Sequence, residues 1–262
     1  MVPSRRSIAD PLISLAMVIG VALVAGLIWQ LAIDRFDLPK ALLPTPRQCW
    51  AAVMSHRGTL LRGILGTGLA AVSGLIAAVI LGSCLAILFS QSKKLRLALF
   101  PYVLLLQTVP IVAIAPLLII WSGYRFRTVI IVTVIVCFFP IVNSVTAGLL
   151  SASREASDLF RLYGANRWQR LWRLQIPSAI PHLMVGVRTS SGLAVIGAIV
   201  AEFFIGDATS FPGLGTLMMG WQALIKTDAL IAAVFASALL GLVIYGVIQL
   251  LTGFLLKRWT ST

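Results

Sequence analysis

The segment DLFRLYGANRWQRLWRLQIP, residues 158–177, is the longest interruption in a chain that is otherwise almost entirely apolar. Its apolar residues recur three and four positions apart on either side of Gly164-Ala165-Asn166. This spacing indicates two short amphipathic helices joined at a glycine turn. Four arginines keep the segment at an aqueous surface, and Pro177 is expected to end it. Because a short amphipathic helix can insert into a groove on another protein, we expect this segment to bind a partner.

The composition is that of an all-α integral membrane protein. Hydrophobic residues make up 59% of the 262 residues and charged residues only 11%, with a mean hydropathy of +0.99. A soluble domain carries about 25% charged residues. The net charge of +13 comes from basic residues at the ends of apolar segments, as the positive-inside rule predicts. We therefore expect the lipid bilayer, and no nucleic acid, as the environment of this chain.

Six apolar segments are long enough to cross a bilayer. They cover about residues 11–33, 63–90, 98–121, 128–150, 182–205 and 229–256. The basic residues between spans two and three, between spans four and five, and after span six mark the cytoplasmic side, so both termini are expected there. We predict an N-terminal transmembrane helix with an outer connection over residues 1–57. A core domain of five spans, with the loop 154–177, is predicted over residues 58–262.

Small residues form stripes along two of these spans. In the second span they occupy every fourth position from Gly66 to Ser90. Such stripes let helices approach closely in lipid, where the hydrophobic effect does not drive packing. In the fifth span the same spacing runs from Gly186 to Ala198 and continues to Glu202. Glu202 is therefore expected to point into the bundle or into a dimer interface, and not at lipid.

The third span contains three prolines, at positions 101, 110 and 116, which predict a bent or broken helix. Gln107 and Thr108 precede Pro110, and these three residues are candidates for lining a transport pathway. A bent packing helix in which Gln107 bonds to a neighbour explains the same pattern equally well.

Three further polar residues lie inside spans and are assigned to a pathway or gate: Asn143, Arg188 and Glu202. Charges within a membrane are costly and are usually functional or paired. Arg188 and Glu202 are 14 residues apart, about 21 Å along a helix, so they cannot pair with each other within one helix. Arg188 is expected to snorkel or to meet a carboxylate of another helix. Glu202 is expected to belong to an outer gate or to bind a helix end across a subunit interface.

No catalytic or metal-binding constellation is evident in the sequence. Cys49, Cys84 and Cys137 are far apart and form neither a metal-like spacing nor an even disulfide set. The segment GWQALIKT, residues 220–227, lacks the glycine that a phosphate-binding loop needs directly before its lysine. We therefore expect that the chain is not an enzyme and holds no metal and no cofactor.

Residues 158–177 resemble the coupling loop of inner-membrane permease subunits of ATP-binding-cassette (ABC) importers. That signature reads Glu-Ala-Ala, three residues, Gly, nine residues, Ile-x-Leu-Pro. Residues 158–160, Gly164 and residues 174–177 match its spacing, with relaxed residue types. The resemblance covers about residues 60–256 and includes residues 106–110, 201–204 and 213–215. The relaxed form is similar to the branch that moves nitrate, taurine, alkanesulfonates, bicarbonate and some vitamin precursors.

The resemblance implies a type I importer permease of a bacterial inner membrane, which forms the substrate pathway by alternating access. Two permease copies, expected as a homodimer, would assemble with a dimer of ABC ATPase subunits, which bind the ATP, and with an external substrate-binding protein. The residues implied in ATPase coupling are Asp158, Leu159, Phe160, Tyr163, Gly164, Ala165, Trp168 and Pro177. Asp158 is expected to cap a helix or to contact a basic residue of the ATPase. Gly164 is expected to form the turn at a place where a β-carbon does not fit.

Three alternatives are weighed against this interpretation. A self-contained secondary transporter or channel would need ionisable residues at the membrane midplane and often inverted repeats, whereas the charged positions here lie near span ends. A membrane enzyme would need a catalytic set. Residues 158–177 could also be a basic amphipathic segment on the lipid surface. The substrate, whether a small anion, a sulfonate or a vitamin precursor, is not decided by these residues, because the external protein carries most of the selectivity in this family.

Overall fold

The computed structural model describes residues 9–206 and 212–260, with side chains for residues 16–206 and 212–255. Within these ranges the chain is helical and contains no strand. The helices are α1 (Ala9–Phe36), α2 (Pro46–Ser55), α3 (Arg57–Gln91), α4 (Lys93–Thr108), α5 (Ile111–Ser122), α6 (Phe126–Leu150), α7 (Arg154–Leu162), α8 (Arg167–Arg170), the π-helical turn η1 (Leu171–Gln175), α9 (Ile176–Ile205), α10 (Leu214–Ala223) and α11 (Thr227–Thr260).

Five of the described helical segments are long and apolar enough to cross a membrane. They are Ala16–Phe36, Arg57–Gln91, Phe126–Leu150, Arg167–Ile205 and Thr227–Leu255. The pair of α4 and α5 makes a sixth span if it is counted as one broken helix. The predicted all-α membrane fold with about six spans is thus confirmed.

The chain folds as two compact units. The first consists of Met1–Arg57 and Trp221–Ala232, and the second of Gly58–Gly220 and Ala233–Thr262. In the first unit, Thr45 caps α2: its hydroxyl accepts from the backbone N–H of Gln48 at 3.3 Å, and the Gln48 side chain returns the bond at 2.9 Å. The hydroxyl of Thr227 donates to the carbonyl oxygen of Ala41 at 2.6 Å, which ties the start of α11 to the segment before α2.

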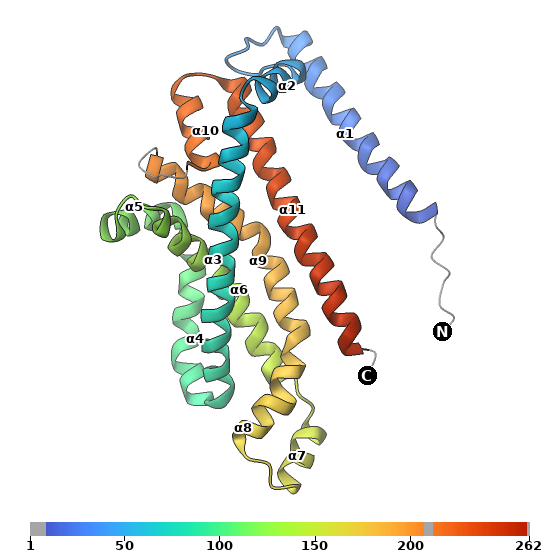
Figure 1. Ribbon diagram of the computed structural model, residues 1–262, viewed down its shortest axis with the longest axis vertical. Helices are drawn as coiled ribbons and strands as arrows, with labels where there is room; N and C mark the ends of the chain where they lie inside the picture. The colour runs from blue at the N-terminus through green and yellow to red at the C-terminus, as the bar shows by residue number, and fades with distance from the viewer. Residues whose placement is uncertain (1–8, 207–211, 261–262) are drawn as a thin grey trace. The chain divides into compact units, whose positions relative to one another are not determined.

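The core of the second unit lies where α3, α5, α6 and α9 meet. Figure 1 shows α3, α6 and α9 side by side, and α6 and α9 make the most extensive helix pair. The centre is filled by small and β-branched side chains, including Ala70, Ala78, Val132, Ala194 and Ala198, each fully buried. These residues come from the predicted small-residue stripes and from the facing side of α6.

The glycines of the stripes touch the neighbouring helices directly. A β-carbon at Gly74 would overlap Thr133 of α6, and one at Gly82 would lie 2.8 Å from a methyl carbon of Ile141. On α9, a β-carbon at Gly186 would lie 2.9 Å from the β-carbon of Ser144. Because these distances leave no room for a methyl group, the stripes fix how closely the helices pack. The predicted packing role of the stripes is confirmed.

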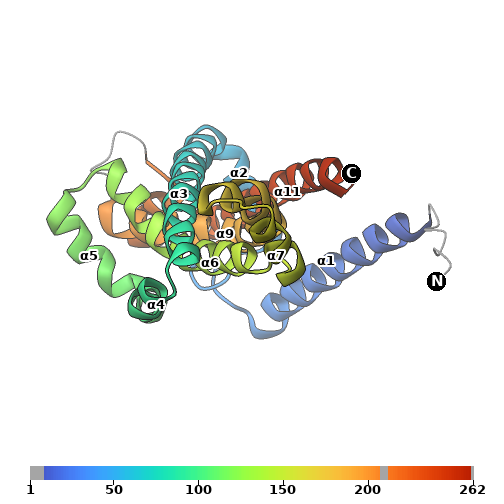
Figure 2. The same ribbon diagram turned by 90° about the horizontal axis from the view of Figure 1, so that it is seen from below.

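The predicted third span is broken at Pro110. Helices α4 and α5 meet at an angle of 100° across residues 109 and 110, and Figure 2 views α4 nearly end-on while α5 runs across the picture. Val109 and Pro110 both have extended backbone conformations, and Pro110 lies at the N-cap of α5. Pro101 and Pro116 lie inside helices without ending them. Of the two predicted possibilities, bent or broken, the break is the one observed.

The prediction that Pro177 ends the loop segment is wrong. From Arg167 to Ile205 the helix is continuous, and Pro177 lies in the first turn of α9. Directly before it, η1 widens the helix, so that the N–H of Ile176 donates to the carbonyl oxygen of Leu171, five residues earlier. Proline has no N–H for the regular i→i−4 bond. The widened turn accommodates this residue within a continuous helix, as π-bulges do.

Candidate functional site

The predicted binding segment is a hairpin of two helices at one end of the second unit. Ser153 caps α7 by accepting from the backbone N–H of Ala156 at 3.1 Å. Asn166 caps α8 through a reciprocal pair of 2.8 Å bonds with Gln169. Between the two caps, Gly164 has a φ of 69°, a left-handed conformation that favours glycine. The predicted helix–turn–helix is therefore present, and both helices begin at a capped residue.

Two details of the hairpin differ from expectation. A β-carbon at Gly164 would meet no atom within 4 Å, so its positive φ, and not crowding, explains the glycine. Asp158 does not cap α7, because the helix already begins at Arg154 with Ser153 as its cap. Asp158 instead forms an exposed ion pair with Arg161 at 3.6 Å, a type of contact that contributes little to stability.

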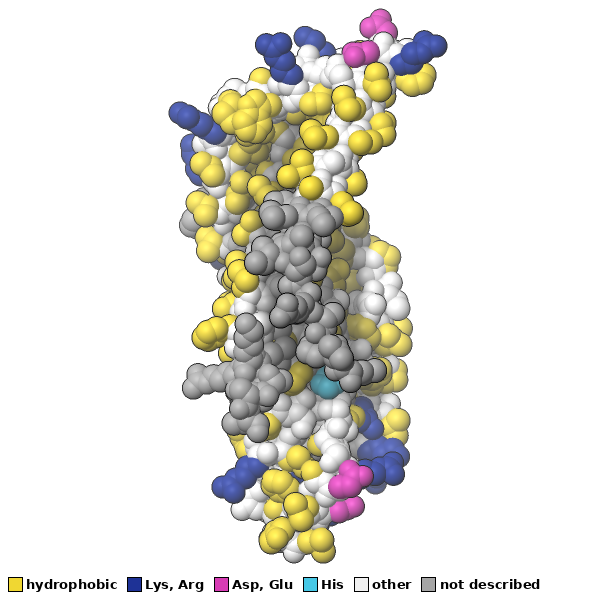
Figure 3. Space-filling model, turned by 90° about the vertical axis from the view of Figure 1, so that its right-hand side faces the viewer, with side chains coloured by type: hydrophobic (Ala, Val, Ile, Leu, Met, Phe, Trp, Pro, Cys, Tyr) yellow, Lys and Arg dark blue, Asp and Glu magenta, His cyan; other side chains and the backbone are white. Residues whose placement is uncertain are grey.

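The apolar residues of the hairpin are uncovered. Tyr163 is 84% exposed and Trp168 is 68% exposed, although both are large aromatic side chains. The lower end of Figure 3 shows hydrophobic side chains lying between basic and acidic ones. A hollow of about 310 Å³ is lined by Leu159, Phe160, Tyr163, Ala165, Gln169 and Arg173. The fold thus brings together four of the predicted coupling residues, whereas Trp168 and Pro177 do not line this hollow.

A second hollow lies at the break between α4 and α5. It has a volume of about 280 Å³ and contains the predicted Gln107, Thr108 and Pro110, together with Ile135, Val136 and Pro140 of α6 and Leu193 of α9. The hydroxyl of Thr108 donates to the carbonyl oxygen of Leu105 at 2.9 Å. Within the described chain the Gln107 amide makes no hydrogen bond to a neighbour, so the packing alternative for Gln107 finds no support in one copy of the chain.

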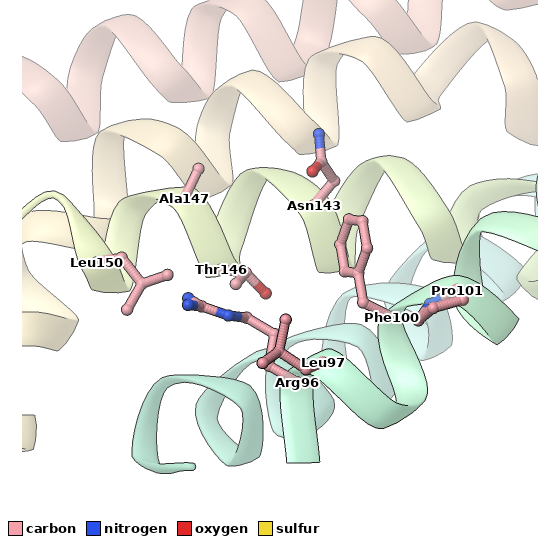
Figure 4. Close-up of a pocket in the computed structure, with 8 residues that line it drawn as sticks. All are labelled: Arg96, Leu97, Phe100, Pro101, Asn143, Thr146, Ala147 and Leu150. Atoms are coloured by element: carbon pink, nitrogen blue, oxygen red, sulfur yellow. The ribbon is translucent and has the colours of Figure 1, made fainter. Parts of the chain in front are cut away.

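Asn143 lies in a different hollow, of about 370 Å³, between α4 and α6 (Figure 4). Arg96 of α4 and Thr146 of α6 extend into it from the two helices, while the amide of Asn143 points away from Arg96. Thr146 is buried, and its hydroxyl has no hydrogen-bond partner among the described residues. Sequence reasoning missed Arg96 and Thr146 as lining residues. Thr146 follows Asn143 by three residues and so shares its helix face, a signal that could have identified it.

Arg188 is half-buried on α9, and its Nε is buried without a hydrogen-bond partner in the described part of the chain. The guanidinium forms no ion pair with a described carboxylate. An arginine within a membrane span is costly unless it is paired or its guanidinium snorkels to an aqueous surface, so the predicted snorkelling of Arg188 stays a prediction. The expected carboxylate partner from another helix is not present among the described residues.

Glu202 is buried and binds the start of α10. The Thr67 hydroxyl donates to the carboxylate, with its Oγ1 at 2.8 Å from Oε2 and 3.0 Å from Oε1. The N–H of Gly215 donates to Oε2 at 2.9 Å, and the N–H of Leu214 donates to Thr67 Oγ1 at 2.8 Å. The prediction that Glu202 points into the bundle is confirmed. The helix end that it binds, the start of α10, belongs to its own chain and not to another subunit. The alternative, a role of Glu202 in an outer gate, stays a prediction.

Thr67 is a site residue that sequence reasoning missed. It is fully buried and stands 135 residues from Glu202 in the chain. Its only sequence signal is its place beside Gly66 on the α3 stripe. Among the described residues, no cluster of three or more histidine, cysteine or acidic side chains could hold a metal ion.

Comparisons with known proteins place this geometry in context. The family described as "Binding-protein-dependent transport system inner membrane component" matches residues 74–260. The chain is 32% identical to the formylaminopyrimidine transport permease protein of Halalkalibacterium halodurans, over 89% of this chain and 92% of that protein. It is 33% identical to the riboflavin transport system permease protein of Chloroflexus aurantiacus, over 89% and 86% of the two chains. A putative aliphatic sulfonates transport permease protein of Bacillus subtilis is 28% identical, over 90% and 84%.

Proposed function

Because the chain belongs to the family of binding-protein-dependent transport system inner membrane components, we propose that it is the permease subunit that couples an importer to ATP hydrolysis. The observation that carries this proposal is the hairpin of α7 and α8, with its uncovered Leu159, Tyr163 and Trp168. Large apolar side chains at an aqueous surface mark an interaction site. A short amphipathic helix seated in a groove of an ATPase would bury them.

The hairpin is joined rigidly to a membrane span, and this supports a role in transmitting motion from an ATPase to the membrane. Its second helix continues without interruption from Arg167 to Ile205, through the whole of α9. A displacement of α8 by a bound ATPase is therefore a displacement of the span itself, and no flexible linker lies between them. In the proposed cycle, ATP draws two ATPase subunits together, the two hairpins move with them, and the spans rock to open the pathway on the opposite side. Hydrolysis resets this arrangement.

The proposed assembly contains two copies of this chain as a homodimer, a dimer of ABC ATPase subunits and an external substrate-binding protein. The positive-inside rule supports a cytoplasmic position for the hairpin and for both termini, because basic residues flank it and lie near both ends of the chain. ATP is bound by the partner ATPase, and this chain carries no cofactor of its own. The compartment is the bacterial inner membrane.

The pathway is proposed to run along α4, α6 and α9. Gln107 at the α4–α5 break, Asn143 and Thr146 in the hollow beside α4, and Arg188 on α9 are polar groups without partners in the described chain. Polar groups at membrane depth face a cavity or another subunit in preference to lipid. The relatives are named for a formylaminopyrimidine, riboflavin and aliphatic sulfonates. We accordingly propose a small anion, a sulfonate or a vitamin precursor as the substrate.

Co-purification tests the coupling role. Leu159→Asp and Ser157→Asp add the same charge to α7, but Leu159 lines the hairpin hollow whereas Ser157 lines another. The tagged chain is extracted from its host in mild detergent, and bound proteins are identified by mass spectrometry. We expect an ABC ATPase to accompany the wild type and Ser157→Asp, and to be lost from Leu159→Asp.

Each other result contradicts a specific part of the proposal. If no ATPase accompanies the wild type and the reconstituted chain alone moves solute, the importer role is wrong. Retention of the ATPase by Leu159→Asp would remove the hairpin hollow from the coupling surface. Loss from both variants would show that added charge on α7, and not the apolar face, governs binding.

A further inference from the structure

Glu202 is the most buried carboxylate that the structure describes, with 4% of its surface exposed, and it makes no ion pair there. Its charge is met by the Thr67 hydroxyl and by the N–H of Gly215. Gly215 belongs to the first turn of α10, where free N–H groups and the helix dipole favour an anion. Among the described residues, the donors to this carboxylate are thus a hydroxyl and the start of α10, and not a lysine or arginine.

The Thr67 hydroxyl lies at the centre of this contact, where it both donates and accepts a hydrogen bond. Its proton goes to the carboxylate of Glu202 on α9, and its oxygen accepts the N–H of Leu214 on α10. Thr67 itself belongs to α3. A single side chain of α3 thus joins two consecutive helices, α9 and α10, at residues that lie 135 and 147 positions later in the chain. We name the group of Thr67, Glu202, Leu214 and Gly215 the carboxylate clamp.

Glycines at three positions allow the backbone to approach the carboxylate clamp closely. A β-carbon at Gly213 would overlap the carboxylate of Glu202, and one at Gly215 would lie 2.7 Å from the Glu202 β-carbon. On α3, a β-carbon at Gly66 would lie 2.8 Å from the carbonyl oxygen of Pro212. By contrast, a β-carbon at Gly220, later in α10, would meet nothing within 4 Å. Of the two glycines within α10, only Gly215, at the clamped end, thus lies in such close contact.

We propose that the carboxylate clamp locks the start of α10 to α3 and α9, so that the three move as one body during transport and position the outer end of the pathway. The inference rests on the proposed importer function. Opening the clamp would leave a buried carboxylate without donors, a state that is strongly unfavourable away from water. At the α4–α5 break, by contrast, the Thr108 hydroxyl bonds only within its own helix, to the carbonyl oxygen of Leu105, and does not join α4 to another helix.

The clamp is tested with two matched pairs of variants. Thr67→Val removes the hydroxyl at nearly constant shape, and Thr67→Ser keeps it. Gly215→Ala places a methyl group against Glu202, whereas Gly220→Ala places one in open space. The wild type and the four variants are reconstituted with the ATPase and the binding protein. Uptake and ATP hydrolysis are measured together, and hydrogen exchange of residues 214–215 is measured in the permease alone.

We expect Thr67→Val and Gly215→Ala to assemble and hydrolyse ATP while uptake per ATP falls about tenfold. Thr67→Val acts by removing a hydrogen bond to a charged group, and a factor of about ten corresponds to the lower end of what such a bond contributes. Gly215→Ala acts by pushing α10 away from Glu202. Exchange at residues 214–215 rises in these two variants, and Thr67→Ser and Gly220→Ala behave as wild type. The ratio of uptake to hydrolysis separates positioning from stability, because a merely structural contact would lower both in proportion to folded complex.

Three results overturn the inference. Unchanged exchange in Thr67→Val would show that the hydroxyl does not hold α10. Raised exchange with a normal uptake-to-ATP ratio would show a clamp that has no part in transport. A proportional fall of uptake and hydrolysis would assign it to stability. If the wild type shows no ATP-dependent uptake, the importer function itself fails, and the exchange data, which need no ATPase, still decide whether the clamp holds α10.

Discussion

Gly164 is the residue at which the α7–α8 turn can be tested most directly. Its φ of 69° is unfavourable for β-branched residues, whereas asparagine adopts this conformation readily. A β-carbon at this position would meet no atom within 4 Å, so a larger side chain causes no steric clash within the chain. We predict that Gly164→Val lowers uptake by roughly an order of magnitude, because strain of about 1–2 kcal/mol distorts the turn, while Gly164→Asn retains it. Uptake in whole cells, normalised to permease in the membrane, measures both.

The two substitutions differ little in volume, and this makes their comparison informative. Equal loss in both variants would mean that a side chain at this position blocks the partner surface. Normal uptake in both would mean that the turn geometry is not needed for coupling.

At single residues, the sequence predicts a role well when its partner is close in the chain. The spacing of Leu159 and Tyr163 before Gly164, repeated by Trp168 and Trp172 after it, indicated the hairpin correctly, because helix periodicity and a glycine turn are local properties. The burial of Glu202 also followed from its place on a small-residue face. Its partner Thr67 did not, since a contact between residues 135 positions apart depends on how α3 and α9 pack.

Among the elements, the break between α4 and α5 forms one wall of the hollow that Gln107 and Thr108 line. Pro110 at the N-cap of α5 provides no N–H to continue α4, and it keeps Val109 extended. We predict that Pro110→Ala favours helix across residues 109–110, because alanine is better than proline in a helix interior by about 3 kcal/mol. Uptake should fall severalfold while the ATPase remains bound, as judged by transport assays and co-purification.

Pro116→Ala is the matched control for this element, because Pro116 lies inside α5 without ending it. Uptake by this variant should stay close to that of the wild type. If both substitutions lowered uptake equally, the loss of uptake would come from a general change in α5 and not from closing the break between α4 and α5.

The sequence located these helices better than it located their ends. Prolines at positions 101, 110 and 116 gave the same signal, yet only Pro110 breaks a helix. Proline is tolerated inside a membrane helix wherever its surroundings satisfy the freed backbone groups, and those surroundings are set by tertiary structure, which the local sequence does not specify. Pro177 is a second example. The helix continues past it because a π-helical turn precedes it, and no residue pattern in the sequence predicts such a turn.

For the whole molecule, the orientation in the membrane decides whether the proposed mechanism is possible. The hairpin follows the C-terminal end of α6, and the turn at Gly123 precedes its N-terminal end. The 25 residues of α6 extend about 36 Å, enough to separate the two ends by a bilayer. ATP is cytoplasmic, so the importer mechanism requires the hairpin on that side and the turn at Gly123 on the other.

Labelling of single cysteines tests this orientation. Tyr163 in the hairpin and Tyr124 beside Gly123 are both exposed tyrosines, and each is replaced by cysteine in a background without Cys49, Cys84 and Cys137. A membrane-impermeant maleimide should label Tyr163→Cys only in inverted vesicles and Tyr124→Cys only in right-side-out vesicles. Labelling of both in disrupted membranes controls for accessibility. The opposite pattern would place the hairpin outside, away from ATP, and would exclude ATPase coupling through α7 and α8 whatever protein those helices bind.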